Sequence, residues 1–296
     1  MFSGLSAFPL TPIYNNSLDE STFVGLIQNL VDAQVDSIGV LGSTGSYAYL
    51  TREERKHVAQ IAVQHSQHIP VMVGISALNL RDVLFNLEDA QTVGAKAVLL
   101  APMSYQKLTE DEVYKLYAHV AEYSSIPLCV YDNPSTTHFN FTDELHGRIA
   151  HLPNVQAIKI PPVPDNQQQA QDRVNQLRAL VPDNVKIGIS GDFSAAIGLA
   201  SGCDAWFSVI GGLYPNVSKA LIAAVQTGDK QETLRLSESL KPIWELFQRH
   251  GSLRVIAAAA EIQGLVQTPC LPLPLNSLVG EERDKLAEVL SFLSLS

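Results

Sequence analysis

The sequence has few of the residues that mark disulfide-rich, metal-binding or nucleic-acid-binding proteins. It contains only three cysteines in 296 residues, Cys129, Cys203 and Cys270. Their wide spacing and odd number argue against a disulfide framework and against a paired CxxC metal site. Basic residues are also scarce, since 20 lysines and arginines stand against 30 acidic residues, for a net charge of -10. This balance argues against nucleic acids and anionic membranes as partners.

Two further absences concern targeting. No lysine or arginine precedes Arg52, which removes the basic start of a secretory signal. No apolar run approaches the length needed to cross a bilayer. We therefore expect a cytoplasmic globular protein, whose 46% hydrophobic content is ample for an extensive core.

A strand–helix pattern is repeated along most of the chain. Segments with helical periodicity separate short apolar runs, and several of them begin with a hydroxyl followed by carboxylates, as at Thr51 and Thr109. Apolar strands that alternate with helices indicate a parallel sheet. The runs recur mostly at intervals of roughly 25 to 35 residues, the span of one strand–helix unit. There are eight of them: residues 5–9, 37–41, 70–74, 97–101, 127–131, 155–160, 185–190 and 205–210.

Eight units favour a closed (β/α)8 TIM barrel, in the α/β class, over the runner-up, an open doubly wound sheet. We expect the catalytic barrel to occupy residues 1–225. Residues 226–296 are expected to form a C-terminal helical appendage, because the alternation stops after residue 210. The segments expected there are helices near residues 213–227, 230–250 and 252–264, a proline-rich stretch at 268–274, and a last helix at 281–293.

Lys159 is the most informative single residue. It lies in the apolar run 155–160 and is followed almost at once by two prolines. In a TIM barrel the carboxyl ends of the strands form the mouth of the active site. A lysine buried there loses solvation, which favours the neutral, nucleophilic amine. The alternative is a strand-end lysine that extends its ammonium group to solvent.

Polar residues follow two other strands. Tyr131 ends the run before that of Lys159, so we expect the phenol and the amine to lie side by side on neighbouring strands. Ser43 and Thr44 lie between two glycines, in a turn that can offer backbone N–H and hydroxyl donors to a small carboxylate. A half-buried tyrosine with a solvated hydroxyl and a simple glycine turn are the alternatives.

Other candidate groups indicate structure rather than chemistry. Asp192 follows Gly191 and is expected to cap a helix. Four histidines occur in two pairs without a carboxylate or cysteine to complete a ligand set, and we expect them at the surface: His65 with His68 and His146 with His151. We therefore expect neither a metal nor a cofactor.

At the residues singled out above, the chain resembles the dihydrodipicolinate synthase and N-acetylneuraminate lyase family, barrels that bind pyruvate or a related 2-oxo acid as a lysine imine. The resemblance spans most of the chain. It implies that Lys159 forms the imine and that Tyr131 transfers protons. It also implies a homo-oligomer, either a dimer or a tetramer. The substrate-binding positions it implies are Ser43, Thr44, Gly191 and Phe207.

The chain departs from the family pattern where a second substrate would bind. The synthases have an arginine in the turn after the tyrosine, whereas this chain has Thr136, which we expect at the substrate site. A hydroxyl cannot replace a bidentate guanidinium. The family's second tyrosine would fall near Ser104, one position from Tyr105. Whether either residue joins a proton relay stays open.

These observations predict a Schiff-base-forming class I lyase or aldolase that acts on pyruvate or a related 2-oxo acid. Three alternatives are 4-hydroxy-tetrahydrodipicolinate synthase proper, a phosphate-binding barrel enzyme without an imine, and a non-catalytic sensor of small acids. The sequence leaves the second substrate and the direction of the reaction open.

Overall fold

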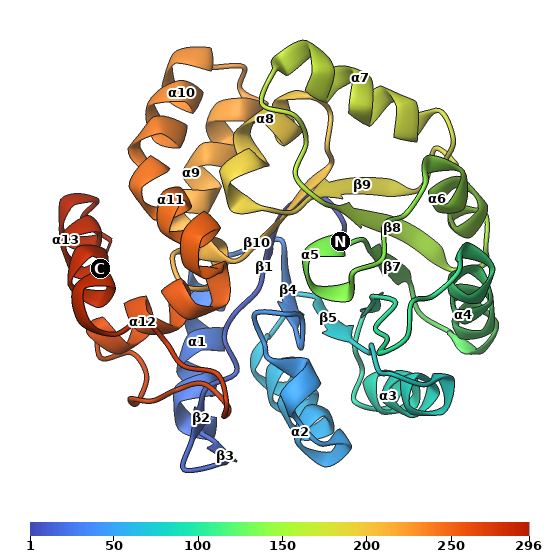
Figure 1. Cartoon of the computed structure of the whole chain (residues 1–296), viewed down its shortest axis with the longest axis horizontal. Coiled ribbons are helices and arrows are strands. Elements are labelled where there is room, and N and C mark those ends of the chain that lie inside the picture. The colour runs from blue at the N-terminus through green and yellow to red at the C-terminus, as the bar shows by residue number, and fades with distance from the viewer. Residues whose placement is uncertain (296) are drawn as a thin grey trace.

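The computed structural model describes residues 1–295, which form a closed barrel of parallel strands surrounded by helices (Figure 1). Each barrel strand pairs with the next one along the chain, and the last pairs with the first. The TIM barrel predicted from the sequence is confirmed, and each predicted strand segment overlaps a barrel strand. These strands are β1 (Gly4–Ala7), β4 (Ser37–Val40), β5 (Val71–Gly74), β6 (Ala97–Leu100), β7 (Leu128–Tyr131), β8 (Val155–Ile160), β9 (Lys186–Ile189) and β10 (Ala205–Ser208).

Helices follow the barrel strands as predicted. Thr51 and Thr109 form capping boxes with Glu54 and Glu112, so the helix starts inferred from hydroxyls and carboxylates are confirmed. Within residues 1–295, no helix combines the length and the hydropathy needed to cross a bilayer. The helices of the barrel units are α1 (Glu20–Asp32), α2 (Arg52–His65), α3 (Leu80–Thr92), α4 (Glu110–Tyr123), α6 (Asp143–Ala150), α7 (Gln167–Arg178), α8 (Ala195–Ala200) and α9 (Pro215–Gln226).

Several short elements were not predicted, because they are too brief to show a hydrophobic period. A two-stranded hairpin, β2 (Ile13–Tyr14) and β3 (Ser17–Leu18), turns through two asparagines with positive φ. The short helix α5 (Pro134–Thr137) follows β7. Three 3₁₀ helices also lie in loops: η1 (Tyr47–Tyr49), η2 (Asp192–Ser194) and η3 (Ile210–Gly212). Of these, α5, η1, η2 and η3 follow barrel strands and shape the mouth of the barrel.

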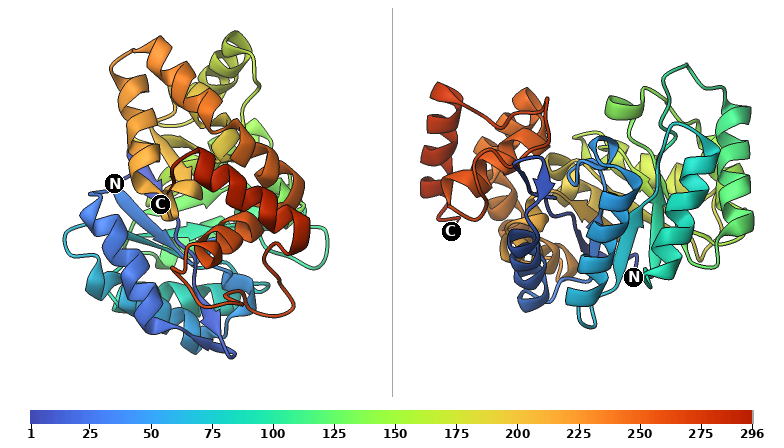
Figure 2. Two further views of the ribbon diagram at one scale, coloured as in Figure 1. Left: turned by 90° about the vertical axis from the view of Figure 1, so that its left-hand side faces the viewer. Right: turned by 90° about the horizontal axis from the view of Figure 1, so that it is seen from below.

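The C-terminal helices pack beside the barrel, as predicted, and form a separate lobe in Figure 2. The single helix expected over residues 230–250 is wrong, because the chain divides there into two. Pro242 has no N–H to donate to the carbonyl of Glu238, so the helix cannot continue through this point. The lobe contains α10 (Lys230–Ser239), α11 (Lys241–His250), α12 (Ser252–Ile262) and α13 (Gly280–Phe292).

The barrel interior holds large rings beside very small residues. A Cβ atom on Gly39 would lie 2.4 Å from the Phe8 ring, and one on Gly188 would lie 2.2 Å from the Phe207 ring. These two glycines therefore make room for the two rings. Alanines contribute the rest of the small volume, at positions 97, 101, 157 and 205 of the interior cluster. The Phe8 and Phe207 rings therefore fill an apolar interior that glycines and alanines leave open.

Glu261 connects several segments of the C-terminal lobe. Its side chain is fully buried on α12, and its Oε2 lies 2.8 Å from Arg283 Nη1 of α13. The same oxygen accepts a hydrogen bond from Ser277 Oγ at 2.7 Å, and Oε1 accepts one from the backbone N–H of Cys270 at 3.1 Å. One carboxylate thus holds α13 and the proline-rich stretch against α12.

We expect Glu261→Ala to lower the free energy of unfolding by about 3 kcal/mol, because it leaves a partly buried guanidinium and a buried N–H without their acceptor. Urea unfolding followed by circular dichroism measures the change. The matched control is Glu288→Ala on the exposed face of α13, which should stay within about 0.5 kcal/mol of the parent. Equal effects of the two substitutions would contradict the role given to Glu261.

Candidate active site

Lys159 lies inside the barrel near the carboxyl end of β8. It pairs with Tyr131 of β7 on one side and with Gly188 of β9 on the other. Only 4% of Lys159 is exposed. The predicted burial of this residue and its position beside Tyr131 are therefore confirmed, and the solvent-directed alternative is wrong.

Three aromatic rings surround the amine of Lys159. Its Nζ lies 4.1 Å from the centre of the Phe8 ring, 4.2 Å from that of Tyr131 and 5.6 Å from that of Phe207. Phe8 and Phe207 also pack edge to face, with their ring centres 6.2 Å apart. We call Phe8, Tyr131 and Phe207 the aromatic cage. Ring faces attract an ammonium ion, whereas burial disfavours it, so the two effects oppose each other.

Burial has the larger effect on the amine. It lowers the pKa of Lys159 from 10.5 to about 8, against the attraction of Cys129 and Asp192 for the charged form. At pH 7 about one amine in ten is then neutral, compared with about three in ten thousand for a solvated lysine. A neutral amine is the nucleophilic form. Lys159 is therefore able to attack an electrophilic carbon at neutral pH.

Tyr131 belongs to a small hydrogen-bond network at the same end of the barrel. Its hydroxyl accepts a hydrogen bond from Asn133 Nδ2 at 2.8 Å and lies 3.3 Å from Ser43 Oγ. Burial raises the pKa of Tyr131, although both hydrogen bonds work in the opposite direction. The phenol therefore stays protonated at neutral pH and can donate its proton.

Three other predicted substrate positions lie in segments that follow barrel strands. Thr44 is buried in the loop after β4, beside Ser43. Gly191 follows β9 with a φ of +80°, and a Cβ atom there would lie 2.5 Å from Pro162 Cγ, so only glycine fits. Thr136 is exposed on α5, and its Oγ1 lies 3.4 Å from the carbonyl oxygen of Asn133.

Ser104 and Tyr105 lie in the loop after β6. Tyr105 is 89% exposed, and the Ser104 hydroxyl donates to the carbonyl of Gln106 at 2.5 Å. In the described part of the chain, the hydrogen-bond partners of the Tyr131 hydroxyl are Ser43 and Asn133. Neither Ser104 nor Tyr105 therefore joins the phenol's network within this chain.

The prediction that Asp192 caps a helix is wrong. Its buried carboxylate accepts hydrogen bonds from Trp206 Nε1 at 2.9 Å and from the backbone N–H groups of Val209 and Ile210 at 3.2 and 2.7 Å. Burial raises the pKa of this carboxyl group, against those bonds. Asp192 thus ties the loop after β9 to the loop after β10, a contact between segments that the local pattern could not reveal.

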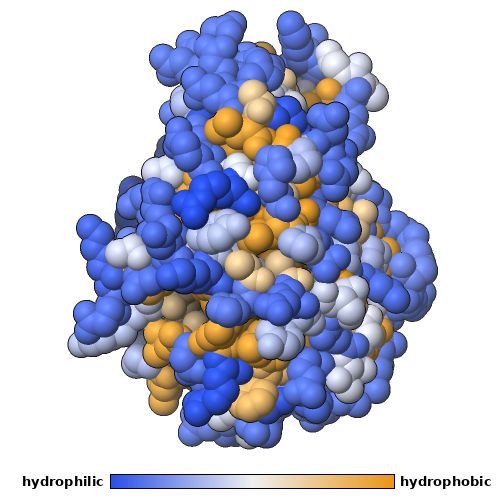
Figure 3. Space-filling view, turned by 90° about the vertical axis from the view of Figure 1, so that its right-hand side faces the viewer, coloured by the Kyte–Doolittle hydropathy of each residue, from blue (hydrophilic) through white to orange (hydrophobic). Residues whose placement is uncertain are grey.

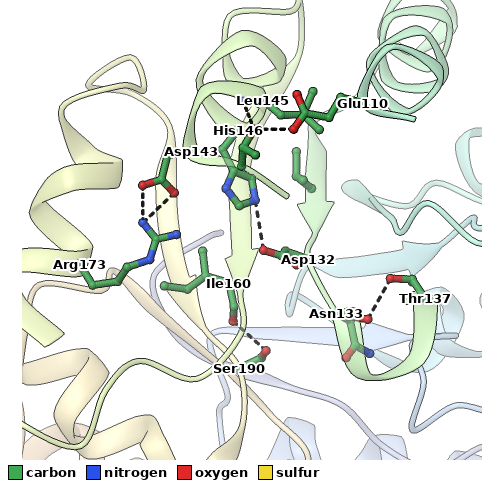
Figure 4. Close-up of polar contacts among 12 residues, drawn as sticks. Glu110, Asp132, Asn133, Thr137, Asp143, Leu145, His146, Ile160, Arg173 and Ser190 are labelled. Atoms are coloured by element: carbon green, nitrogen blue, oxygen red, sulfur yellow. Dashed lines mark hydrogen bonds and ion pairs between the residues drawn. The ribbon is translucent and has the colours of Figure 1, made fainter. Parts of the chain in front are cut away.

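The prediction that His146 lies at the surface is also wrong. His146 is fully buried on α6, stacks on Phe141 with ring centres 4.8 Å apart, and places Nε2 3.4 Å from Asp132 Oδ2 (Figure 4). The face of α6 that carries it is covered by the barrel. His65, His68 and His151 are exposed, as predicted. Among residues 1–295, no group of three His, Cys, Asp or Glu side chains could hold a metal ion.

Two residues of the site were missed in the sequence. Phe8 directly follows β1, and Asn133 stands two positions after Tyr131. Side chains two apart along an extended chain point to the same side, so this spacing could have identified Asn133. Phe8 could have been found as the residue just beyond the carboxyl end of a barrel strand.

We expect Lys159→Met to stabilise the fold at pH 7 by up to about 3 kcal/mol, the equivalent of the pKa difference between the unfolded and folded states. The lysine opposes folding fully below pH 8, where its amine is charged in both states. Its destabilising effect decreases between pH 8 and pH 10.5, where the amine is largely protonated only in the unfolded state. Urea unfolding at pH 7 and at pH 10 measures the gain, which should be smaller at pH 10.

The exposed Lys115 of α4 provides the matched control. Lys115→Met should give no gain that depends on pH. A gain for Lys159→Met that is equal at both pH values, or a loss at both, would contradict the lowered pKa.

Comparisons with known proteins identify the family of the chain. The profile of the dihydrodipicolinate synthetase family matches residues 1–293. The chain is 26% identical to the 4-hydroxy-tetrahydrodipicolinate synthase of Rickettsia montanensis over 296 residues, which are 100% of this chain and 98% of the relative.

Solved structures show the same similarity. Dihydrodipicolinate synthase from Agrobacterium tumefaciens aligns with a TM-score of 0.94 and 41% identity, over 99% of this chain and 98% of the other. The synthase from Aquifex aeolicus shares the fold, with a TM-score of 0.91 and 24% identity over 100% and 99% of the two chains. The chain therefore belongs to the dihydrodipicolinate synthetase family, whose members are Schiff-base-forming lyases and synthases.

Proposed function

We propose that this chain is a class I lyase or aldolase that binds pyruvate, or a related 2-oxo acid, as an imine on Lys159. The observation that carries the proposal is the buried amine inside the aromatic cage, with its pKa lowered to about 8. The adjacent phenol of Tyr131 supplies the proton donor that imine formation requires. The names of the relatives, which are synthases of the same family, support this assignment.

The first step is addition of the neutral amine to the keto carbon. A C–N bond forms, the C=O π bond opens, and the oxygen takes the electron pair. Tyr131 gives this oxygen its proton, and the phenolate left behind takes the proton that the new ammonium nitrogen loses. A second proton from the phenol then releases water and leaves the protonated imine.

The imine then acts as an electron sink. It lets the neighbouring carbon lose a proton or break a C–C bond, and Tyr131 moves the proton in either case. Ser43 and Thr44 hold the substrate carboxylate in this proposal, because their loop presents hydroxyl and backbone donors at the mouth. Gly191 and Phe207 line the pocket. No step of this sequence requires a cofactor.

The second substrate is a carbonyl compound whose recognition does not depend on a cation at position 136. Thr136 presents a neutral hydroxyl from an exposed position on α5. Such a group can hydrogen-bond to a hydroxyl or carbonyl of the second substrate, but it offers no bidentate partner to a carboxylate. This favours an aldehyde that lacks a carboxylate at this point over the partner used by the synthases.

The remaining expectations extend the proposal. We expect residues 1–225 to form the catalytic barrel and residues 226–296 to form the C-terminal helical region, of which residue 296 lies outside the described residues. We expect the protein to be cytoplasmic and to form a homo-oligomer, either a dimer or a tetramer. Large apolar side chains that are exposed could contribute to a subunit contact, among them Leu78 at 60% and Tyr105 at 89%. Figure 3 shows hydrophobic residues among hydrophilic ones on the side that carries α3, α4 and α6.

Reduction with borohydride in the presence of pyruvate should fix one reduced pyruvate covalently to Lys159, because borohydride reduces the imine. Peptide mass spectrometry locates the adduct. The Lys159→Met variant should carry none, whereas Lys115→Met should be labelled like the parent. An unlabelled parent, or an adduct that persists in the Lys159→Met variant, would refute the proposed function.

Tyr131→Phe should lower the rate of imine formation by about a hundredfold to ten-thousandfold, because it removes the proton donor while keeping the ring of the cage. The rate is measured by quenching with borohydride at successive times. Tyr123→Phe, at a side chain that is 62% exposed on α4, is the control and should keep the parent rate. A Tyr131→Phe variant with the parent rate would exclude the phenol as proton donor.

A further inference from the structure

We propose that Asn133 is a positioning residue for the proton donor: its amide N–H, held in one orientation by Ser135, fixes the direction of the Tyr131 hydroxyl and stabilises the phenolate. This inference rests on the proposed function, in which Tyr131 transfers protons.

The orientation of the Asn133 amide follows from its partners. Its Oδ1 accepts a hydrogen bond from Ser135 Oγ at 2.7 Å, so Nδ2 is the atom that faces the barrel. Nδ2 lies 2.8 Å from the Tyr131 hydroxyl and 3.4 Å from Ser43 Oγ. An amide nitrogen can only donate. The phenol oxygen must therefore accept, and its own proton stays available to another acceptor.

The backbone of Asn133 is held independently of its side chain. Its carbonyl accepts hydrogen bonds from the backbone N–H groups of Thr136 and Thr137, at 3.1 and 3.0 Å, and from Thr137 Oγ1 at 3.0 Å. These bonds form the short helix α5. A change at the Asn133 side chain therefore leaves the helix contacts of its backbone in place.

The preceding residue anchors the same segment from the opposite side. Figure 4 shows the Asp132 carboxylate directed toward His146 on α6, while the amide of Asn133 points away from it. The backbone N–H of Asp132 donates to the carbonyl of Lys159 at 3.0 Å. The end of β7 thus lies against α6 and is hydrogen-bonded to β8, while the Asn133 amide donates to the phenol.

The hydrogen bond changes with the charge of the phenol. While Tyr131 is protonated, the amide occupies one lone pair of the phenol oxygen, and the hydroxyl proton can point to Ser43 or to the substrate oxygen. When that proton moves to the substrate, the phenolate keeps the N–H donor at 2.8 Å and gains a charge-assisted bond. The donor therefore favours the charged intermediate over the resting phenol, which is the condition for lowering a barrier.

Asn133→Leu removes the donor with little change in side-chain volume. We expect it to lower the rate of imine formation at saturating pyruvate by about tenfold to a hundredfold, with less than about a threefold change in the pyruvate concentration that gives half the maximal rate. Asn140→Leu, an exposed asparagine on the same loop, is the matched control and should keep the parent rate. A parent-like rate for Asn133→Leu would overturn the inference.

Asn133→Asp separates positioning by the N–H from a purely structural role. Near pH 8 its carboxylate accepts a hydrogen bond from the phenol hydroxyl and directs that proton away from the substrate, so the rate should fall further than in Asn133→Leu. As the pH falls toward about 5 the carboxylate begins to protonate and can donate, so the ratio of its rate to the parent rate should rise. A ratio that stays constant between pH 5 and pH 8 would show that the side chain matters only for structure.

The borohydride adduct distinguishes failure of this inference from failure of the proposed function. If the parent forms the Lys159 adduct but the Asn133 variants match it in rate and pH profile, the inference fails and the function stands. If the parent forms no adduct, the function itself fails.

Discussion

An amine buried among aromatic rings is the constraint on which the rest of the site depends. Water would hold Lys159 as an ammonium ion, and the barrel withdraws that water: only 4% of the residue is exposed, and three rings lie within 5.6 Å of its nitrogen. Burial lowers the pKa of the amine to about 8, although Cys129 and Asp192 favour the charged form. Ring faces also attract an ammonium ion. The barrel thus keeps a reactive group at a cost in stability, a common arrangement at functional sites.

Small residues make room for the rings, and contacts between loops hold the strand ends that carry them. Gly39 and Gly188 leave the space that Phe8 and Phe207 fill, and any side chain at these positions would displace the rings. Asp192 connects the loops after β9 and β10 through three hydrogen bonds, and Asp132 connects the end of β7 to α6. Neither aspartate contacts the amine directly. Each instead holds a strand end from which a residue of the site extends.

Much of this arrangement could be predicted from the sequence because it is local or periodic. The apolar runs located all eight strands, and the strand order of a parallel barrel placed Tyr131 beside Lys159. Thr51 and Thr109 marked their helices because a capping box is contained within four residues. The break before Pro242 was not predicted, although it is local too, since a helix interior does not accept a proline.

The rest depends on contacts between distant segments. His146 was expected at the surface because nothing in its own segment shows that α6 turns this residue toward the barrel. Asp192 was expected to cap its own helix, whereas its partners belong to the next strand and loop, 14 to 18 residues away. The bond from Asn133 to Tyr131 spans only two residues, but Asn133 reaches Ser43 only once β4 and β7 enclose the same space. The choice of second substrate depends on the loops at the mouth of the barrel, and no local sequence pattern describes how those loops are arranged.

The ionisation of Lys159 can be measured directly by competitive labelling of the amines with acetic anhydride across a range of pH, with the Lys159 peptide quantified by mass spectrometry. Reactivity follows the neutral fraction of each amine. A titration midpoint near 8 is expected for Lys159, and the peptide of the exposed Lys115 is quantified in the same sample as the reference. A midpoint near 10.5 for Lys159 would contradict the central claim that burial in the barrel makes this amine a nucleophile at neutral pH.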